Sequence, residues 1–207
     1  MAVDVVIRPR GEIQWGMGEF KELTKSLGLA YGYLTEEWTL IDFDHDEIEE
    51  FTLVVYDPKR VNRGFTIYTE AGVEYIHLSQ PIPATAYDVQ NLFAFTEAFC
   101  KKYGIDTVYP DDEEISLAQF MASKNNIANS HRQVVADMTR NRQENLCIIG
   151  AKKPVMICNY YDELGAVLEK DNLVYTPGTT YKIVFDEEDA SADLMETYAR
   201  ILHEAQE

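Results

Sequence analysis

Basic side chains gather in one stretch of this acidic sequence, and they are the residues best suited to hold an anion. The chain carries a formal charge of −18, yet between Ala122 and Lys153 six basic residues stand against two acidic ones, a local balance of +4. Arginine binds phosphate or carboxylate through paired hydrogen bonds, and lysine adds a point charge. The candidate ligand-binding residues are Arg132, Arg140, Arg142, Lys152 and Lys153. Pairing of these cations with acidic segments of the same chain is the alternative interpretation.

A second charged stretch, residues 36–50, has eight acidic residues and no lysine or arginine. Asp42, Asp44 and Asp46 have the alternate spacing with which a calcium-binding loop begins. Such a loop requires glycine at its sixth position and glutamate at its twelfth, where this sequence has Glu47 and Leu53. The pattern therefore indicates a solvated acidic segment and no metal site. The alternative is an acidic face that steers a basic protein partner, formed by Asp44, Asp46, Glu47, Glu49 and Glu50.

The residues that could act as nucleophiles or general bases form no catalytic pattern. Cys100 falls on the apolar stripe of an expected helix, while Cys147 and Cys158 fall in expected strands without a histidine motif. The four histidines lack the HxxxH or HxH spacing of a metal site, and His77 is expected to be a half-buried strand residue. No GxSxG motif is present. The sequence predicts no catalytic residue, metal or cofactor; it favours a non-enzymatic role and leaves the question of an enzyme open.

Composition narrows the class of partner and the compartment. Hydrophobic residues make up 46% of the chain and aromatic residues 12%, which excludes disorder as its main state. The negative charge argues against nucleic acid or an anionic membrane as partner, because both require basic surface. We expect no signal peptide, and no apolar run approaches the ~20 residues of a membrane span. Three cysteines fit a reducing cytoplasm better than a disulfide framework.

The stretch from Gly64 to Gly104 carries the clearest structural signals. Two apolar runs flank Glu70-Ala71-Gly72, which fits a three-residue hairpin loop because glycine can take the positive φ needed at its end. This loop would set Thr69 opposite Val73, Ile67 opposite Tyr75, and Phe65 opposite His77. In that register both faces of the hairpin are largely apolar. We therefore expect the sheet to be covered on both sides or to meet a partner.

A long amphipathic helix follows this hairpin. Pro81 and Pro83 end the second strand, because proline cannot donate to a sheet ladder. Thr85 is expected to cap the helix, with Asp88 at its third position and Gly104 at its end. The apolar positions have helical spacing: Val89, Leu92, Phe93, Thr96, Phe99, Cys100 and Tyr103.

Further elements are expected on either side of this region. We predict strands at Val3–Ile7 and Phe51–Tyr56 and a short helix at Glu19–Leu27. The acidic run from Pro110 to Glu114 predicts a helix entry, and the helical period from Leu117 to Arg142 predicts two helices or one bent helix. Later strands are expected at residues 147–149, 155–158, 173–175 and 181–185, before a C-terminal helix that opens at Asp186.

Three short segments carry a family resemblance: Val55-Tyr56-Asp57-Pro58, Arg63-Gly64-Phe65, and Leu78 to Pro83 leading into the capped helix. Together they resemble a bacterial protein family catalogued as domain of unknown function 4299, over about residues 50–104. The motif residues are Asp57, Pro58, Arg63 and Gly64. The resemblance implies a cytoplasmic bacterial α+β protein and no catalytic residue. The long acidic stretch and Gln80 stand out as departures from that pattern.

The sequence as a whole predicts an α+β fold, with a mainly antiparallel sheet packed by several helices, including a C-terminal helix. We expect one domain over residues 1–207; the alternative is a hairpin–helix subdomain at 1–106 and a second at 107–207. The predicted function is a non-enzymatic protein-interaction module with an acidic surface for a basic partner. Binding of a small anion, or an enzymatic role, at the basic stretch is the rival. A homodimer through the hairpin edge is compatible with either.

Overall fold

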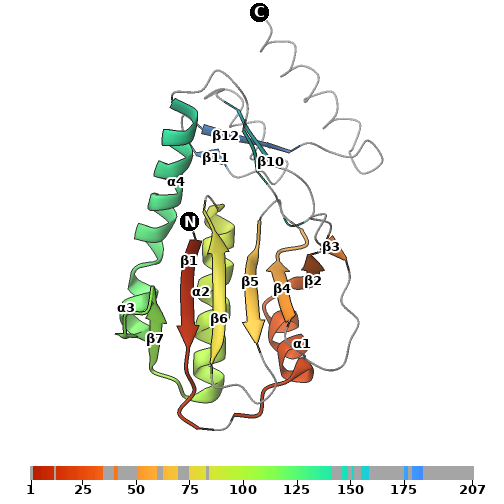
Figure 1. Ribbon diagram of the computed structural model, residues 1–207, viewed down its shortest axis with the longest axis vertical. Helices are drawn as coiled ribbons and strands as arrows, with labels where there is room; N and C mark the ends of the chain where they lie inside the picture. The colour runs from red at the N-terminus through yellow and green to blue at the C-terminus, as the bar shows by residue number, and fades with distance from the viewer. Residues whose placement is uncertain are drawn as a thin grey trace, which may run out of the picture.

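The computed structural model describes residues 2–11, 13–34, 40–41, 51–59, 63–69, 75–82, 84–140, 146–148, 151, 155–158, 175–176 and 179–183. Within them lies an eight-stranded sheet with strand order β3-β2-β4-β5-β6-β1-β7-β8, and every neighbouring pair is antiparallel (Figure 1). The strands are β1 Ala2–Ile7, β2 Ala30–Leu34, β3 Leu40–Ile41, β4 Phe51–Tyr56, β5 Phe65–Thr69, β6 Ile76–Pro81, β7 Thr107–Pro110 and β8 Ile115–Ser116. The expected α+β class and antiparallel sheet are confirmed.

The register of the β5–β6 hairpin differs from the one that the sequence predicted. Ile67 pairs with Leu78 and Tyr68 with His77, a shift of three residues from the expected pairing. An odd shift exchanges the two faces, so Ile76 and Leu78 join Phe65 and Ile67 on one buried face. The prediction that both faces of the hairpin are apolar was therefore wrong, because it followed from a loop that was too short. His77 is half-buried, as expected, but it does not face Phe65.

The two strands of this hairpin lie in the middle of the sheet. β5 pairs with β4 and β6, and β6 pairs with β5 and β1. The hairpin therefore offers no free edge for the homodimer that the sequence suggested. β3 and β8 end the sheet instead.

Two helices cover one face of the sheet: α1 (Met17–Ser26) and α2 (Ala86–Tyr103), which lie behind the strands in Figure 1. Between these helices and the sheet, large side chains are fully buried, among them Phe20, Phe65, Phe95 and Phe99. Burying one such side chain stabilises the fold by ~2–3 kcal/mol relative to leaving it exposed. The predicted apolar positions of α2 are all buried except Tyr103, which is half-buried.

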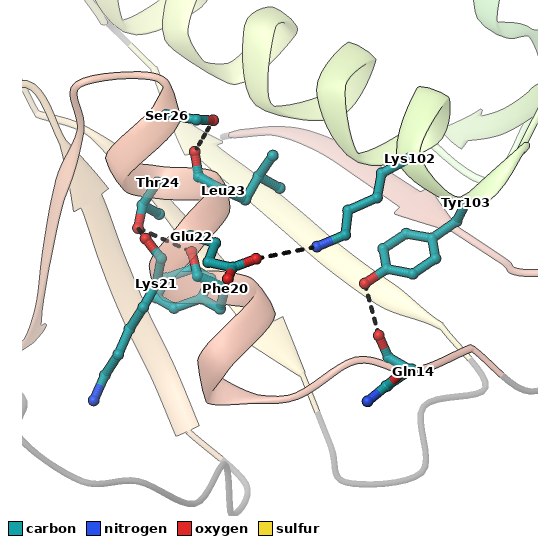
Figure 2. Close-up of polar contacts among 9 residues, drawn as sticks. All are labelled: Gln14, Phe20, Lys21, Glu22, Leu23, Thr24, Ser26, Lys102 and Tyr103. Atoms are coloured by element: carbon teal, nitrogen blue, oxygen red, sulfur yellow. Dashed lines mark hydrogen bonds and ion pairs between the residues drawn. The ribbon is translucent and has the colours of Figure 1, made fainter.

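Figure 2 shows how the end of α2 meets α1 and the segment before it. The Tyr103 hydroxyl donates to the Gln14 carbonyl oxygen at 2.7 Å, and Lys102 Nζ lies 3.9 Å from a Glu22 carboxylate oxygen. The ring of Tyr103 also packs edge-on against Trp15, with ring centroids 6.2 Å apart. The ion pair is solvent-exposed and therefore weak, so the hydrogen bond and the aromatic contacts of Tyr103 hold this corner together.

Both predicted ends of α2 are confirmed. The Thr85 side chain accepts a hydrogen bond from Asp88 N, and the Asp88 side chain accepts one from Thr85 N, which completes a capping box. Gly104 ends the helix at φ 65°, in the left-handed region that favours glycine. Local residue chemistry alone determines both ends.

The expected break in the next helical region is present, but the expected helix entry before it was wrong. α3 (Leu117–Ala122) and α4 (Lys124–Arg140) meet at Ser123. The run Pro110–Glu114 does not open a helix; it makes the turn between β7 and β8, with Asp111 at φ 49° and Asp112 at φ 64°. Glu113 N donates to Pro110 O at 2.9 Å across this turn. Positive φ at both central residues is the signature of a type I′ hairpin turn, which aspartate tolerates.

A second sheet has strand order β11-β12-β10-β9, and its strands are β9 Leu146–Ile148, β10 Val155–Cys158, β11 Tyr175–Thr176 and β12 Thr179–Ile183. β9 and β10 confirm the strands expected around Cys147 and Cys158. The expected C-terminal helix from Asp186 lies outside the described residues. No helix among the described residues is long and apolar enough to cross a membrane. The choice between one domain and two stays a prediction.

Candidate functional site

Most residues of the two charged candidate sites lie outside the described part of the chain. Arg142, Lys152 and Lys153 are outside it, and so is the whole acidic set from Asp44 to Glu50. Arg132 and Arg140 belong to α4, eight residues apart on the same helix. The described structure therefore places two members of the basic set on one helix and does not test the sets as sites.

The four family-like motif residues, in contrast, are all described. Asp57 Oδ1 accepts a hydrogen bond from Lys59 N at 2.9 Å, so Asp57 and Pro58 close a local turn after β4. Arg63 N and Gly64 N, just before β5, donate to Asp88 Oδ2 and Oδ1 at 3.1 and 2.8 Å. The Arg-Gly pair thus fastens the start of β5 to the first turn of α2.

Gly64 is required at its position for two reasons. Its φ of 69° lies in the left-handed region, and a Cβ atom there would overlap the carbonyl oxygen of Val55 on the neighbouring strand. Glycine is the residue that avoids both the backbone strain and the overlap. The conformation also aims the Gly64 N–H at Asp88, so the glycine and the carboxylate work as one unit.

Asp88 is fully buried and receives three backbone N–H groups, from Arg63, Gly64 and Thr85. Burial raises the pKa of the Asp88 carboxyl, and the hydrogen bonds from Thr85, Arg63 and Gly64 oppose that shift. Every one of these contacts is a donor, and the positive end of α2 lies beside them, so they favour the ionised carboxylate and oppose the larger effect of burial. Asp88 is a structural junction between β5 and α2.

His131 of α4 reaches the same end of α2 and is buried. Its Nδ1 accepts a hydrogen bond from Ala84 N at 2.8 Å, one residue before the cap of α2. Burial lowers the pKa of His131 to about 4, and the positive charge of Arg63 adds to that effect. His131 is therefore neutral at pH 7. Because Nδ1 is the acceptor, the ring proton must reside on Nε2.

Gln80, near the end of β6, completes this polar corner. Burial alternates along β6, and Gln80 follows Ile76 and Leu78 on the face that α2 covers. Its side chain is 0% exposed, yet neither Oε1 nor Nε2 finds a hydrogen-bond partner within the described structure. The Nε2 atom of His131 is also buried there without a partner. Buried polar atoms are nearly always paired, so these three atoms mark the corner as unusual.

Sequence reasoning missed this corner, although two signals point to it. Gln80 has the two-residue period of Ile76 and Leu78, which assigns it to the buried face of its strand. His131 lies four residues after Ile127, which packs against the core, so it belongs to the buried face of α4. Each signal concerns a single element, and only the tertiary structure brings β6 and α4 to the amino end of α2.

The β7–β8 turn forms a second notable surface, on the outside of the molecule. Asp111, Asp112, Glu113 and Glu114 are all exposed, and none forms an ion pair with another described residue. Asp106, just before β7, pairs with Arg10 at 3.1 Å, with both side chains exposed. We call Asp111–Glu114 the acidic turn. The Asp111 N–H donates to Asp4 O at 3.1 Å, which ties this turn to β1.

Two further reactive groups, Cys100 and His77, have structural contacts. Cys100 is fully buried, and burial raises its pKa to about 12, so its thiol stays protonated and unreactive, as expected of a core residue. His77 Nε2 lies 3.1 Å from Asp4 Oδ1 across neighbouring strands. Among the described residues, no group of three or more histidine, cysteine or carboxylate side chains is arranged to hold a metal ion.

Comparison with known proteins yields a family match. The model of a family described as "Domain of unknown function (DUF4299)" matches residues 2–172. No curated protein and no solved structure matches the chain. The matched range contains both the Asp88 junction and the acidic turn.

Proposed function

The chain belongs to the DUF4299 family, whose description assigns no activity, and we propose that it is a non-enzymatic, cytoplasmic protein-interaction module that binds a basic partner through its acidic surface. The observation that carries the proposal is the acidic turn. Four consecutive exposed carboxylates lie on a backbone that a type I′ turn and the contact with β1 hold in place.

Charge and rigidity together make such a turn suited to recognition. Adjacent like charges repel one another, and a cationic surface relieves that repulsion on binding. The net charge of −18 adds a long-range attraction for basic proteins, which speeds encounter and weakens as salt rises. The acidic stretch at residues 36–50 supplies further charge of the same sign.

The surroundings of Cys100, His131 and His77 also support a role in binding. The Cys100 thiol is protonated and buried, the His131 ring accepts from Ala84, and the His77 ring contacts Asp4. A nucleophile needs an adjacent base and a substrate-accessible position, and none of these three has both. We therefore assign the protein a role in binding a partner.

The test begins with a tagged pull-down from the native cytoplasm at low and at high salt, followed by affinity measurements with the recovered partner. Asp112→Asn combined with Glu113→Gln removes two charges from the acidic turn, and we expect the affinity to fall about 10-fold or more at low salt. The matched control, Glu22→Gln with Glu97→Gln, removes the same charge elsewhere. We expect it to change the affinity less than about twofold.

Equal losses in the two variants would show that only net charge matters and would remove the turn from the proposal. A partner that stays bound at high salt would contradict an electrostatic interface. Charge reversal of Glu47, Glu49 and Glu50 then tests whether the acidic stretch shares the interface; unchanged affinity would exclude it.

The rival function is binding of a small anion at the basic stretch, and the presence of Arg132 and Arg140 on one helix favours it. In that case an anionic metabolite raises the melting temperature, and Arg132→Ala with Arg140→Ala abolishes the rise. A broad anion screen without any shift would eliminate this function.

A further inference from the structure

The face of the eight-stranded sheet opposite α1 and α2 is covered at one end and open in the middle. At the covered end, Val54 and Tyr56 of β4 are buried and pack with Ala151. Further along the same face, the side chains of β5, β6, β1 and β7 are half-buried. In Figure 1, β5, β6 and β1 lie in front of α2, and no described helix lies before them. Side chains on this open part can therefore be reached from outside the molecule.

The register of the sheet brings three tyrosines together on the open part. Tyr68 of β5 pairs with His77 of β6, which pairs with Val6 of β1. Val6 pairs in turn with Tyr109 of β7, so one row of side chains crosses four strands and spans about 14 Å. Tyr75 precedes His77 by two residues and lies on the same face, with its ring centroid 6.4 Å from that of Tyr68. We call Tyr68, Tyr75 and Tyr109 the tyrosine patch.

One ring of the tyrosine patch already holds a guanidinium group. The Arg8 guanidinium lies over the ring of Tyr109, 4.6 Å from its centroid. A guanidinium stacks on an aromatic face through its charge and its flat shape, whereas the ammonium of lysine is compact and strongly hydrated. Tyr75 is 38% exposed and offers a second ring of the same kind. The contact with Arg8 indicates which cation suits these rings.

The charges beside the tyrosine patch favour a cationic ligand. Asp4 lies on the same face, and its side chain is 42% exposed while it contacts His77. The acidic turn begins two residues after Tyr109 and is bonded to β1 through the Asp111 N–H and the Asp4 carbonyl oxygen. The carboxylates of Asp4 and of the acidic turn thus lie next to the rings, whereas Arg8 brings one positive charge. A basic segment is complementary in charge to this part of the surface.

We propose that the tyrosine patch binds an arginine-rich segment of the basic partner, with guanidinium groups stacked on the tyrosine rings and further positive charges facing Asp4 and the acidic turn. This inference rests on the proposed function and adds the chemistry of the partner. The acidic turn attracts any cation, and the rings supply a preference for arginine over lysine.

Two labelled peptides of equal length and charge, nona-arginine and nona-lysine, separate these two contributions. Their affinities for the full chain are measured at pH 7 and low salt by fluorescence anisotropy. We expect nona-arginine to bind the wild type about fivefold more tightly than nona-lysine, or better. Asp112→Asn with Glu113→Gln removes charge and leaves the rings in place, so it should weaken the binding of both peptides by the same factor.

Three variants connect the preference to the rings. Tyr75→Leu removes one ring and should weaken nona-arginine about threefold, while nona-lysine changes less than about 1.5-fold. Tyr75→Phe keeps the ring and should keep the wild-type ratio of affinities. Tyr33→Leu is the matched control, because Tyr33 is 36% exposed but pairs with Leu53 and so lies on the opposite face of the sheet. Should Tyr75→Leu fail to fold, Tyr68→Leu provides the same comparison.

The outcomes separate this inference from the proposed function. Equal affinities of the two peptides for the wild type would overturn the inference, as would an unchanged ratio in Tyr75→Leu or an equal loss in Tyr33→Leu. The proposed function would survive those results if the acidic-turn variant still weakened both peptides. Unchanged affinities in the acidic-turn variant, with the loss in Tyr75→Leu intact, would contradict the role of the turn and support the tyrosine patch. Binding of neither peptide at low salt would contradict both.

Discussion

Two buried polar groups at the amino end of α2 differ sharply in their surroundings. The Asp88 carboxylate accepts three backbone N–H groups and caps a helix, so each of its contacts ties one element to another. The Gln80 amide lies at the end of the adjacent strand and pairs with nothing in the described structure. A buried polar group with all its hydrogen bonds made indicates a structural role. A buried polar group without a partner indicates either a functional site or a loss of stability that other interactions offset. Four measurements can break or sharpen this comparison.

The largest effect is expected at the paired group, from Gly64→Ala. The added Cβ atom overlaps the Val55 carbonyl oxygen and strains the positive φ, and the shift draws the Gly64 N–H away from Asp88. We expect the free energy of unfolding, measured in urea, to fall by ~3–5 kcal/mol. Gly104→Ala is the matched control, because it has a similar φ of 65° with nothing within 4 Å of the new Cβ. Its cost should be ~1 kcal/mol.

Suppose that Gly64→Ala lowered the free energy of unfolding no more than the control does. The close contact between residue 64 and the Val55 carbonyl oxygen would then place no constraint on the chain. The junction between β5 and α2 would then be less important than its geometry indicates.

The second effect is expected from Asp88→Ala, which leaves three buried backbone N–H groups without an acceptor. We expect a loss of ~3 kcal/mol in the free energy of unfolding. Asp88→Asn retains one acceptor oxygen and should fall between the wild type and the alanine variant. Thr85→Ala removes only the reciprocal half of the capping box and should cost ~1 kcal/mol. A loss from Asp88→Ala no larger than that from Thr85→Ala would contradict a junction role.

The third effect is a dependence of the free energy of unfolding on pH, and it arises from His131. Its pKa is lowered in the folded protein from 6.5 to about 4, so between these pH values the unfolded chain binds a proton that the folded chain does not. The free energy of unfolding should therefore rise with pH across this window, by on the order of 2 kcal/mol, and the His131 contribution should be complete above about pH 6.5.

Asp88 contributes to the pH dependence with the opposite sign. Burial raises its pKa, so its contribution to the free energy of unfolding falls as the pH rises above 3.8, the usual pKa of an aspartate. The His131 contribution is therefore isolated as the difference between the wild type and His131→Asn, each measured by urea unfolding from pH 4 to 7. A constant difference across that range would mean that His131 titrates alike in the folded and unfolded chains.

The smallest effect is expected at the unpaired group. Gln80→Leu removes an unsatisfied buried amide, so the free energy of unfolding should stay the same or rise by up to ~1 kcal/mol. Urea unfolding measures it. A loss of 2 kcal/mol or more would show that the Gln80 amide has a partner after all, and the contrast with Asp88 would disappear.

Sequence patterns predicted the elements that local chemistry controls. Thr85, Asp88 and Gly104 gave correct ends for α2, because caps involve only residues within one turn. β4 was predicted with its observed bounds, and two helices were expected over residues 117–142. The break falls at Ser123, however, whereas the poor helix formers that predicted it, at 125–126 and 129–130, lie inside α4. In contrast, Pro110–Glu114 was misassigned, since acidic residues suit both a first helical turn and a type I′ turn, and pairing with β1 decides between them.

The family motif shows the same division. The Arg63-Gly64 pair was recognised from the sequence, but the structural reason for a glycine at position 64 was not. Asp88 lies 24 residues further along the chain, and Val55 belongs to another strand. Gln80 and His131 each follow the burial period of their own element. Nothing local, however, indicates that the end of β6 and the middle of α4 both lie at the amino end of α2.

The sequence by itself therefore determined the family, the α+β class, the ends of α2 and the burial of Cys100, since these follow from composition and from neighbours along the chain. Only the tertiary structure decided the hairpin register, the junction at Asp88 and the unpaired polar corner. Each of these depends on groups that are distant in sequence. A three-residue shift in register changes no local preference, yet it exchanges which side chains the core buries.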